Sequence, residues 1–163
     1  ELNIGIDGSL DYDREFLLGY DWGVASVHSH FRRPVEEQTA RIITAMRHPA
    51  VNCIGHLQGR RVGKREGIEL DLDAVLDAAV ETGTALEINC NLDRLDATAE
   101  VIAEGARRGV MFVISTDAHS TREFDYHRYG IRQARRGGLP TSLVANTMDR
   151  DRFVTWARDQ RAT

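Results

Sequence analysis

Short apolar runs alternate along the chain with longer stretches in which apolar residues recur every three or four positions. Runs bounded by Gly, Asp or Asn predict β-strands, and the longer spacing predicts amphipathic helices. The expected strands are Leu2–Ile6, Gly23–His28, Val51–His56, Thr84–Asn89 and Val110–Ser115. The expected helices are Pro34–His48, Leu72–Glu81, Ala97–Arg108, Tyr126–Arg136, Ser142–Asn146 and Asp151–Arg161. Strands that alternate with helices predict a parallel α/β sheet.

Three of these strands end in histidine or aspartate. His28 and His30 stand at the end of the second, His56 ends the third, and Asp117 and His119 follow the fifth. Residues two apart on a strand point to the same side, so each pair is expected to converge on one point. Spacing alone does not choose between His28 and His30.

The position of these residues bears on the fold class. Active sites of parallel α/β barrels gather at the C-terminal ends of the strands, so the pattern favours a barrel. Five strands are too few to close a barrel of this type. We therefore expect an incomplete sheet whose earlier strands precede Glu1.

Imidazoles mixed with carboxylates suit Zn²⁺, Mn²⁺ or Fe²⁺ better than Mg²⁺. Such ions activate water and clamp the oxygens of a displacement at phosphorus. The chain has neither a GxSxG nucleophile motif nor a GxxxxGK[ST] phosphate loop. Metal-assisted hydrolysis is therefore the predicted chemistry, with catalytic roles for Asp117, His119 and His28.

Cations cluster on the same predicted rim, where they are expected to hold phosphate groups. The segment that follows the His56 strand is rich in Arg and Lys, and another arginine follows the fourth strand. The substrate is assigned to Arg60, Arg61, Lys64, Arg65, Arg94 and His30. Four other arginines, Arg107, Arg108, Arg135 and Arg136, are expected to be helix-end charges.

Length and composition set outer limits. At 163 residues and 42% hydrophobic, the chain is expected to be one domain spanning residues 1–163. No apolar run reaches the roughly 20 residues of a membrane span, and a net charge of −4 does not by itself indicate a nucleic-acid binder. Cys53 and Cys90 are expected to be buried free thiols in the cytoplasm. The chain opens at Glu1 without Met or a basic signal region, so we expect it to begin inside a longer polypeptide.

Several segments resemble the PHP (polymerase and histidinol phosphatase) domain, in the version found at the C-terminus of bacterial and archaeal family X DNA polymerases. Smaller likenesses are Arg65-Glu66-Gly67, Tyr129-Gly130-Ile131 and Ala134-Arg135-Arg136-Gly137. The main segments are Val24–Phe31, Gly55–Arg60, Ala85–Asn89 and Ile114–Ser120.

The resemblance implies a distorted (β/α)₇ TIM-like barrel with up to three metal ions, Mn²⁺, Zn²⁺ or Fe²⁺, at its C-terminal rim. By motif, the metal ligands are Glu1, His28, His56, Asp117 and His119, with His28 rather than His30 as the ligand of its strand. It also implies Mn²⁺-dependent 3′→5′ exonuclease or DNA end-processing activity, with DNA and a polymerase domain of the same parent chain as partners.

The chain departs from the family pattern at a few places. The family's opening His-x-His strand and two further upstream ligands are absent, Leu57 and Leu92 replace common prolines, and Asn3 stands where Asp is usual. We therefore expect the segment alone to bind metal weakly and to hydrolyse slowly or not at all. Two alternatives stay open: a small-molecule phosphatase of the histidinol-phosphatase type, and a non-catalytic module that stabilises a polymerase.

Overall fold

A five-stranded parallel sheet organises the protein. The structure, a computed structural model, describes residues 1–160. All neighbouring strands pair in parallel, and their order in the sheet is their order in the chain. The strands are β1 (Leu2–Asn3), β2 (Val24–Ser26), β3 (Cys53–Ile54), β4 (Ala85–Asn89) and β5 (Phe112–Ser115). The predicted strands and parallel α/β class are confirmed. Across residues 1–160 the sheet is open, and its closure into a seven-stranded barrel stays a prediction.

Helices join the strands. They are α1 (Arg14–Leu18), α2 (Val35–Met46), α3 (Leu72–Thr82), α4 (Ala99–Arg108), α5 (His127–Arg136) and α6 (Arg150–Asp159), with a 3₁₀ segment η1 (Thr121–Tyr126) before α5. Asp71 and Thr98 cap the N-termini of α3 and α4 with their side chains. Both helices end at a left-handed glycine, Gly83 at φ 69° and Gly109 at φ 86°. These local signals explain why the predicted helix ends were nearly correct.

Two elements differ from expectation. The short helix α1 was not predicted, and it begins where the Asp13 carboxylate accepts a hydrogen bond from the Phe16 N–H at 2.8 Å. The predicted helix Ser142–Asn146 is wrong, because two 3₁₀ turns, η2 (Thr141–Leu143) and η3 (Ala145–Thr147), occupy the region. There the Asn146 amide bonds both backbone groups of Ile114, so the segment covers the edge of β5 instead of coiling. Of the predicted helix Asp151–Arg161, Arg161 lies outside the described residues.

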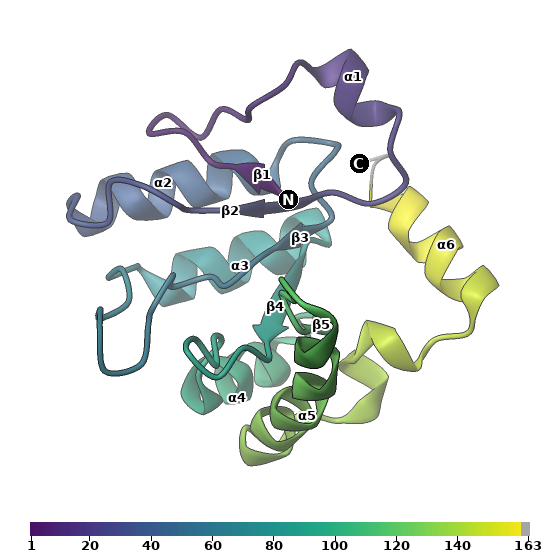
Figure 1. Ribbon diagram of the computed structural model, residues 1–163. Coiled ribbons are helices and arrows are strands. Elements are labelled where there is room, and N and C mark those ends of the chain that lie inside the picture. Colours follow the sequence, from purple (N-terminus) through teal and green to yellow (C-terminus); the bar gives the residue numbers. More distant parts are fainter. Residues whose placement is uncertain (161–163) are drawn as a thin grey trace.

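Consecutive helices pack side by side along the sheet (Figure 1). α2 contacts α3, α3 contacts α4, and α4 contacts α5. Their apolar faces supply fully buried residues such as Ile42, Leu76 and Ile102. Every residue of β4 is buried, including Glu87 and Asn89, so two polar side chains lie inside an otherwise apolar strand.

Helix α6 packs against the N-terminal half of the chain. Phe153 and Trp156 stack against Trp22, with ring centroids 5.1 and 5.6 Å away. The Asn52 amide donates to the Ala157 carbonyl at 2.9 Å. No helix among residues 1–160 is long and apolar enough to cross a membrane.

Candidate metal centre

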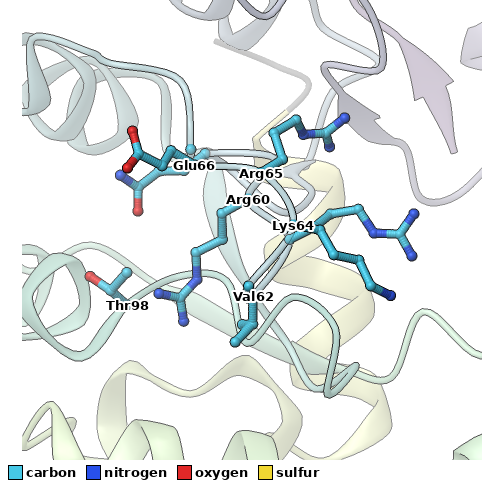
Figure 2. Close-up of a pocket in the computed structure, with 10 residues that line it drawn as sticks. Arg60, Val62, Lys64, Arg65, Glu66 and Thr98 are labelled. Carbon is cyan, nitrogen blue, oxygen red and sulfur yellow. The ribbon is translucent and has the colours of Figure 1, made fainter.

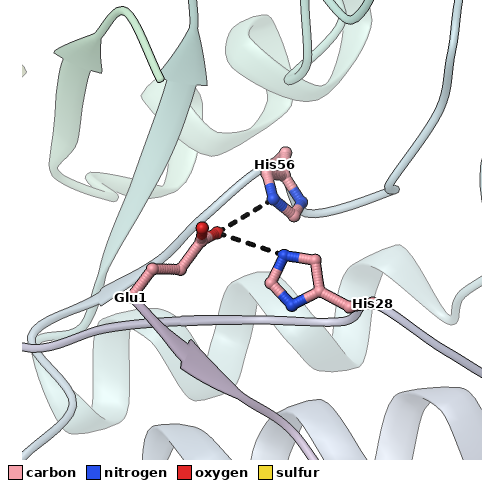
Figure 3. A group of neighbouring side chains, drawn as sticks. All are labelled: Glu1, His28 and His56. Carbon is pink, nitrogen blue, oxygen red and sulfur yellow. Dashed lines mark ion pairs between the residues drawn. The ribbon is translucent and has the colours of Figure 1, made fainter. Parts of the chain in front are cut away.

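Glu1, His28 and His56 meet at the C-terminal ends of β2 and β3, beside β1 (Figure 3). The Glu1 Oε1 atom lies 2.9 Å from His56 Nε2 and 3.4 Å from His28 Nε2. The two imidazole rings stand 5.1 Å apart, nearly edge to face. One potential ligand atom from each residue lies within 4.8 Å of the others. The three side chains therefore surround one point from three separate segments.

A hydrogen-bond chain orients His28. Asn3 donates from its amide nitrogen to Asp11 at 2.7 Å, and this leaves its amide oxygen as an acceptor. That oxygen lies 2.6 Å from His28 Nδ1, so the ring proton belongs on Nδ1. Nε2 then presents its lone pair toward Glu1. Metal-binding histidines are commonly held by such a partner on the other ring nitrogen.

His56 is the buried member of the group, with 1% of its side chain exposed. Among the described residues neither ring nitrogen has a hydrogen-bond partner of good geometry, although Nε2 is within ion-pair distance of Glu1. A buried polar atom without a directional partner is uncommon and invites an explanation. The glycine before His56, Gly55, lets the backbone pass close to the Ser26 side chain. A Cβ at Gly55 would lie 2.4 Å from Ser26 Oγ and 3.5 Å from Glu1 Oε1.

The electrostatics of the three residues favour a positive charge at this point. Contact with the His56 ring, aided by the Ser26 hydroxyl against the effect of burial, lowers the pKa of Glu1 to about 2. Burial lowers the pKa of His56, but the neighbouring Glu1 and Glu87 carboxylates outweigh it and the net pKa is raised. Burial lowers the pKa of His28. The ionised Glu1 carboxylate thus faces two imidazole rings, and the raised pKa of His56 favours the protonated, positively charged form of that ring.

This donor set fits a divalent transition metal. One carboxylate and two imidazoles are the ligands that Zn²⁺, Mn²⁺ and Fe²⁺ accept. The buried His56 ring is the structural observation that tests the fit: its Nε2 faces the Glu1 carboxylate at 2.9 Å without a hydrogen bond of good geometry, and coordination of a divalent ion would satisfy that nitrogen. The residues present are therefore suited to hold such an ion.

Asp117 and His119 lie beyond the end of β5 and do not join the three-residue group. Asp117 is largely buried, and its Oδ2 accepts from the Asn89 amide at 3.1 Å and lies 3.2 Å from Arg94 Nε. His119 is 78% exposed, and its Nδ1 donates to the Asp117 carbonyl at 2.8 Å. Both line a cavity of about 590 Å³ together with Arg94 and Tyr126. They form a second polar group beside the first.

A buried network joins the two groups. The Glu87 carboxylate accepts from the His56 backbone N–H at 2.6 Å and from the Asn89 amide at 3.1 Å. Ser115 of β5 also donates to it. Asn89 in turn contacts Asp117, so a continuous chain of hydrogen bonds crosses from β3 through β4 to β5. Burial raises the pKa of Glu87, partly offset by these donors.

Left-handed backbone marks the strand ends. His30, His56 and Asp117 have φ values of 57°, 25° and 50°. Non-glycine residues in this region are uncommon and cluster at functional sites. The turn at each of these residues also breaks the alternation of side chains along a strand. The rule that residues two apart point to the same side therefore does not predict the direction of the neighbouring side chains. His30 accordingly lies outside the three-residue group, with its carbonyl bonded to the Gln38 amide.

The predicted substrate cations divide into two kinds. Arg60 and Arg65 donate to backbone carbonyls, Arg60 to Arg94 at 2.8 Å and Arg65 to Gly59 at 3.1 Å. Arg61 and Lys64 are more exposed, and both lie 2.8 Å from the same Asp93 oxygen. The loop lines an open pocket of about 670 Å³ (Figure 2). Two of the four cations therefore brace the loop, and two leave a net positive charge on its surface.

Sequence reasoning did not identify the residues that support this rim. Arg41 of α2 is 1% exposed and donates to the carbonyls of Gly5 at 3.0 Å and Ser29 at 3.2 Å. Asp96 is fully buried and accepts from the backbone of Gln58 and Arg60. A charged residue inside an otherwise apolar run could have indicated such buried groups, as Glu87 lies between Leu86 and Ile88.

Comparison with known proteins gives relatives of two kinds. No protein-family profile matches the chain. It is 40% identical over 146 residues to the DNA polymerase/3′-5′ exonuclease PolX of Bacillus subtilis, covering 90% of this chain but 26% of that protein. It is 31% identical over 152 residues to a probable phosphatase of Caldanaerobacter subterraneus, and 29% over 150 residues to one of Thermoanaerobacter sp. strain X514. The chain spans 57% and 59% of those two phosphatases. With the strand-end motifs, these matches show that the chain belongs to the PHP (polymerase and histidinol phosphatase) family, in the form that family X DNA polymerases carry.

Proposed function

We propose that the chain is the metal-dependent phosphoesterase part of a family X DNA polymerase and hydrolyses phosphodiester or phosphomonoester bonds at DNA 3′ ends. The observation that carries the proposal is the convergence of Glu1, His28 and the buried His56, with His56 Nε2 2.9 Å from Glu1 Oε1. The name of the Bacillus subtilis relative, a DNA polymerase and 3′-5′ exonuclease, supports the choice of substrate.

Glu1, His28 and His56 are the proposed ligands of a first ion, with Asp117 and His119 serving a neighbouring ion. Mn²⁺ or Zn²⁺ is proposed, with Fe²⁺ as a further possibility and up to three ions in a complete (β/α)₇ barrel. The chemistry expected of such ions is Lewis-acid activation of water and polarisation of a phosphoryl oxygen.

The side chains of this chain have roles of their own. Asn3 keeps the proton of His28 on Nδ1 and so keeps Nε2 directed at Glu1. His119 holds its Nδ1 proton against the Asp117 carbonyl, which leaves the Nε2 lone pair of this exposed side chain available to bind the neighbouring ion. His28, His119 and Asp117 are the proposed catalytic residues.

Cations at the rim would bind the substrate phosphates. Arg61 and Lys64 share a single carboxylate, so one positive charge is left over for phosphate. Arg94 pairs with Asp117 from the wall of the same cavity. Arg60, Arg65 and His30, which were predicted to contact substrate, are proposed to act by shaping the loops.

The proposal includes a polymerase domain in the same parent chain and a cytoplasmic location. The chain matches 26% of the Bacillus subtilis polymerase, which supports a longer parent. Cys53 and Cys90 are buried and not bonded to each other, as expected for thiols in a reducing compartment.

A nuclease assay on the full-length parent tests the proposal. With Mn²⁺ and a 3′-recessed duplex, we expect 3′→5′ shortening that falls at least ~100-fold in Asp117→Ala and His56→Ala, since loss of a catalytic ion removes Lewis-acid chemistry. His48→Ala is the control, because His48 lies at the end of α2 away from the group. Equal activity in all three variants would sink the proposal.

A second candidate is a phosphatase for small phosphomonoesters, which the names of the Thermoanaerobacter and Caldanaerobacter relatives favour. Turnover of p-nitrophenyl phosphate without DNA cleavage would select it. A non-catalytic role is the third reading. It predicts that neither substrate is hydrolysed, while His56→Ala leaves polymerase activity unchanged.

A further inference from the structure

Helix α5 is seated on the sheet by its small residues. Gly130 and Ala134 are buried, and a Cβ at Gly130 would lie 2.2 Å from Cys90 Sγ and 2.8 Å from the Ile114 side chain. Gln133 donates from its amide to the Ala97 carbonyl at 3.2 Å. These contacts fix the rotation of the helix about its axis, so the opposite face is committed to solvent.

That opposite face carries a stripe of arginines. Arg128, Arg132 and Arg135 recur at helical spacing and are all exposed. Within residues 1–160 none of the three forms an ion pair with a carboxylate. On α4, by contrast, Arg107 and Arg108 are both paired with Glu104. The α5 stripe is therefore positive charge that the protein leaves unneutralised.

The Tyr129 ring contacts two of the three guanidinium groups without cancelling their charge. The Arg128 and Arg132 guanidinium carbons lie 5.0 and 5.9 Å from the centroid of the Tyr129 ring. Tyr129 packs against Tyr126 at 6.0 Å. Tyr126 in turn lines the cavity that contains Asp117 and His119. The basic stripe is thus continuous with the wall of the candidate active site.

We propose that the α5 stripe, defined as Arg128, Arg132 and Arg135, binds the phosphate backbone of the DNA strand whose 3′ end lies in that cavity. The inference rests on the proposed function and extends its substrate site along the helix. From Arg128 to Arg135 the helix rises about 10 Å, at 1.5 Å per residue. One DNA strand advances roughly 3.4 Å per phosphate, so the stripe matches about three phosphates. Contacts of this kind position DNA and do not read its sequence.

Salt-dependent binding of the full-length parent to a labelled 3′-overhang duplex tests the proposal. The measurement is fluorescence anisotropy in EDTA, so that it does not depend on hydrolysis. The test variant is Arg128→Gln/Arg132→Gln/Arg135→Gln. The matched control is Arg150→Gln/Arg152→Gln/Arg158→Gln, which removes three exposed arginines from α6. Circular dichroism and thermal unfolding are to be measured on both variants, to check that each one folds.

The α5 variant is expected to bind at least ~10-fold more weakly at 100 mM salt, with a salt dependence shallower by about 2 to 3 in log K against log[salt]. The α6 variant is expected to change affinity less than twofold. A 4-thiothymidine near the 3′ end should crosslink within residues 122–136. Equal losses in both variants, or no difference together with no crosslink there, would overturn the inference. A selective α5 loss without any Mn²⁺-dependent cleavage would leave the inference standing and refute the nuclease function.

Discussion

Arg41 offers a sharp test of how the rim is held together. Its guanidinium lies in the interior and donates to the carbonyls of Ile4, Gly5 and Ser29 and to the Gln38 side chain. Burial lowers the pKa of Arg41, because the charged guanidinium has lost part of its hydration. Because Ile4 and Gly5 follow β1 and Ser29 follows His28, the side chain ties both ligand segments to α2.

Replacing Arg41 with Met keeps most of the buried volume but removes every donor. The carbonyls of Ile4 and Ser29 and the Gln38 side-chain oxygen lose their donor, whereas the Gly5 carbonyl still accepts from the Gly8 N–H at 3.1 Å. At the low end of about 1 kcal/mol for each of the three unsatisfied groups, the change costs roughly 3 kcal/mol. That is a large part of the 5–15 kcal/mol by which a typical domain is stable. With a urea m-value of about 2 kcal/mol/M, the midpoint should fall by roughly 1.5 M.

Urea unfolding followed by tryptophan fluorescence in EDTA measures this change. Arg47→Met, at the C-terminal end of the same helix, is the matched control. The Arg47 side chain is 62% exposed, and its ion pair with Glu81 is long, at 3.9 Å. An exposed pair of that kind contributes about 0–1 kcal/mol. If the midpoints of the two variants fall by the same amount, or if Arg41→Met loses less than about 1 kcal/mol, the buried tether does not carry the stability assigned to it.

Three further predictions follow from contacts of single side chains. Asn3→Ala should weaken Mn²⁺ binding by about 10- to 100-fold with little loss of stability, since His28 loses its orienting acceptor; an unchanged calorimetric titration would contradict this. Gly130→Ala should destabilise by about 1–3 kcal/mol through overpacking, and Cys90→Ala in the same chain should restore most of it in thermal unfolding; simple additivity of the two changes would argue against the contact. Burial raises the pKa of Glu87 above 4.5, so between pH 4.5 and the raised pKa the folded state holds a proton that the unfolded state has released. The free energy of unfolding therefore falls as pH rises through this range. Glu87→Gln should remove that part of the pH dependence in EDTA, and identical pH profiles would refute the sign.

Much of the fold could be predicted because its signals are local. The strands are short apolar runs, and the ends of α3 and α4 carry a capping side chain and a left-handed glycine. The missed helix α1 has only five residues and too few turns to show a period. The region of η2 and η3 was mistaken for a helix because its structure is set by the pairing of Asn146 with Ile114, which is distant in sequence.

The candidate site was predictable in its residue types and only partly in its geometry. Histidines at strand ends identified the rim, but the choice between His28 and His30 depends on a left-handed turn that side-chain alternation cannot reveal. Arg60 and Arg65 also bind backbone carbonyls of loops, and the sequence pattern did not reveal these contacts. A cationic run in sequence therefore indicates a positive surface without separating bracing arginines from those available to a ligand.

The order of the strands has a consequence for how the chain folds. Within residues 1–160, each strand pairs only with strands that come next to it along the chain, separated by one helical connection. Such a sheet can grow one unit at a time as the chain emerges from the ribosome, with little entropy lost per added strand. The packing of α6 is different, because Asn52 bonds to Ala157, 105 residues later in the chain. We therefore expect α6 to dock after the sheet has formed, so that weakening its contact with Trp22 speeds unfolding and leaves the folding rate nearly unchanged.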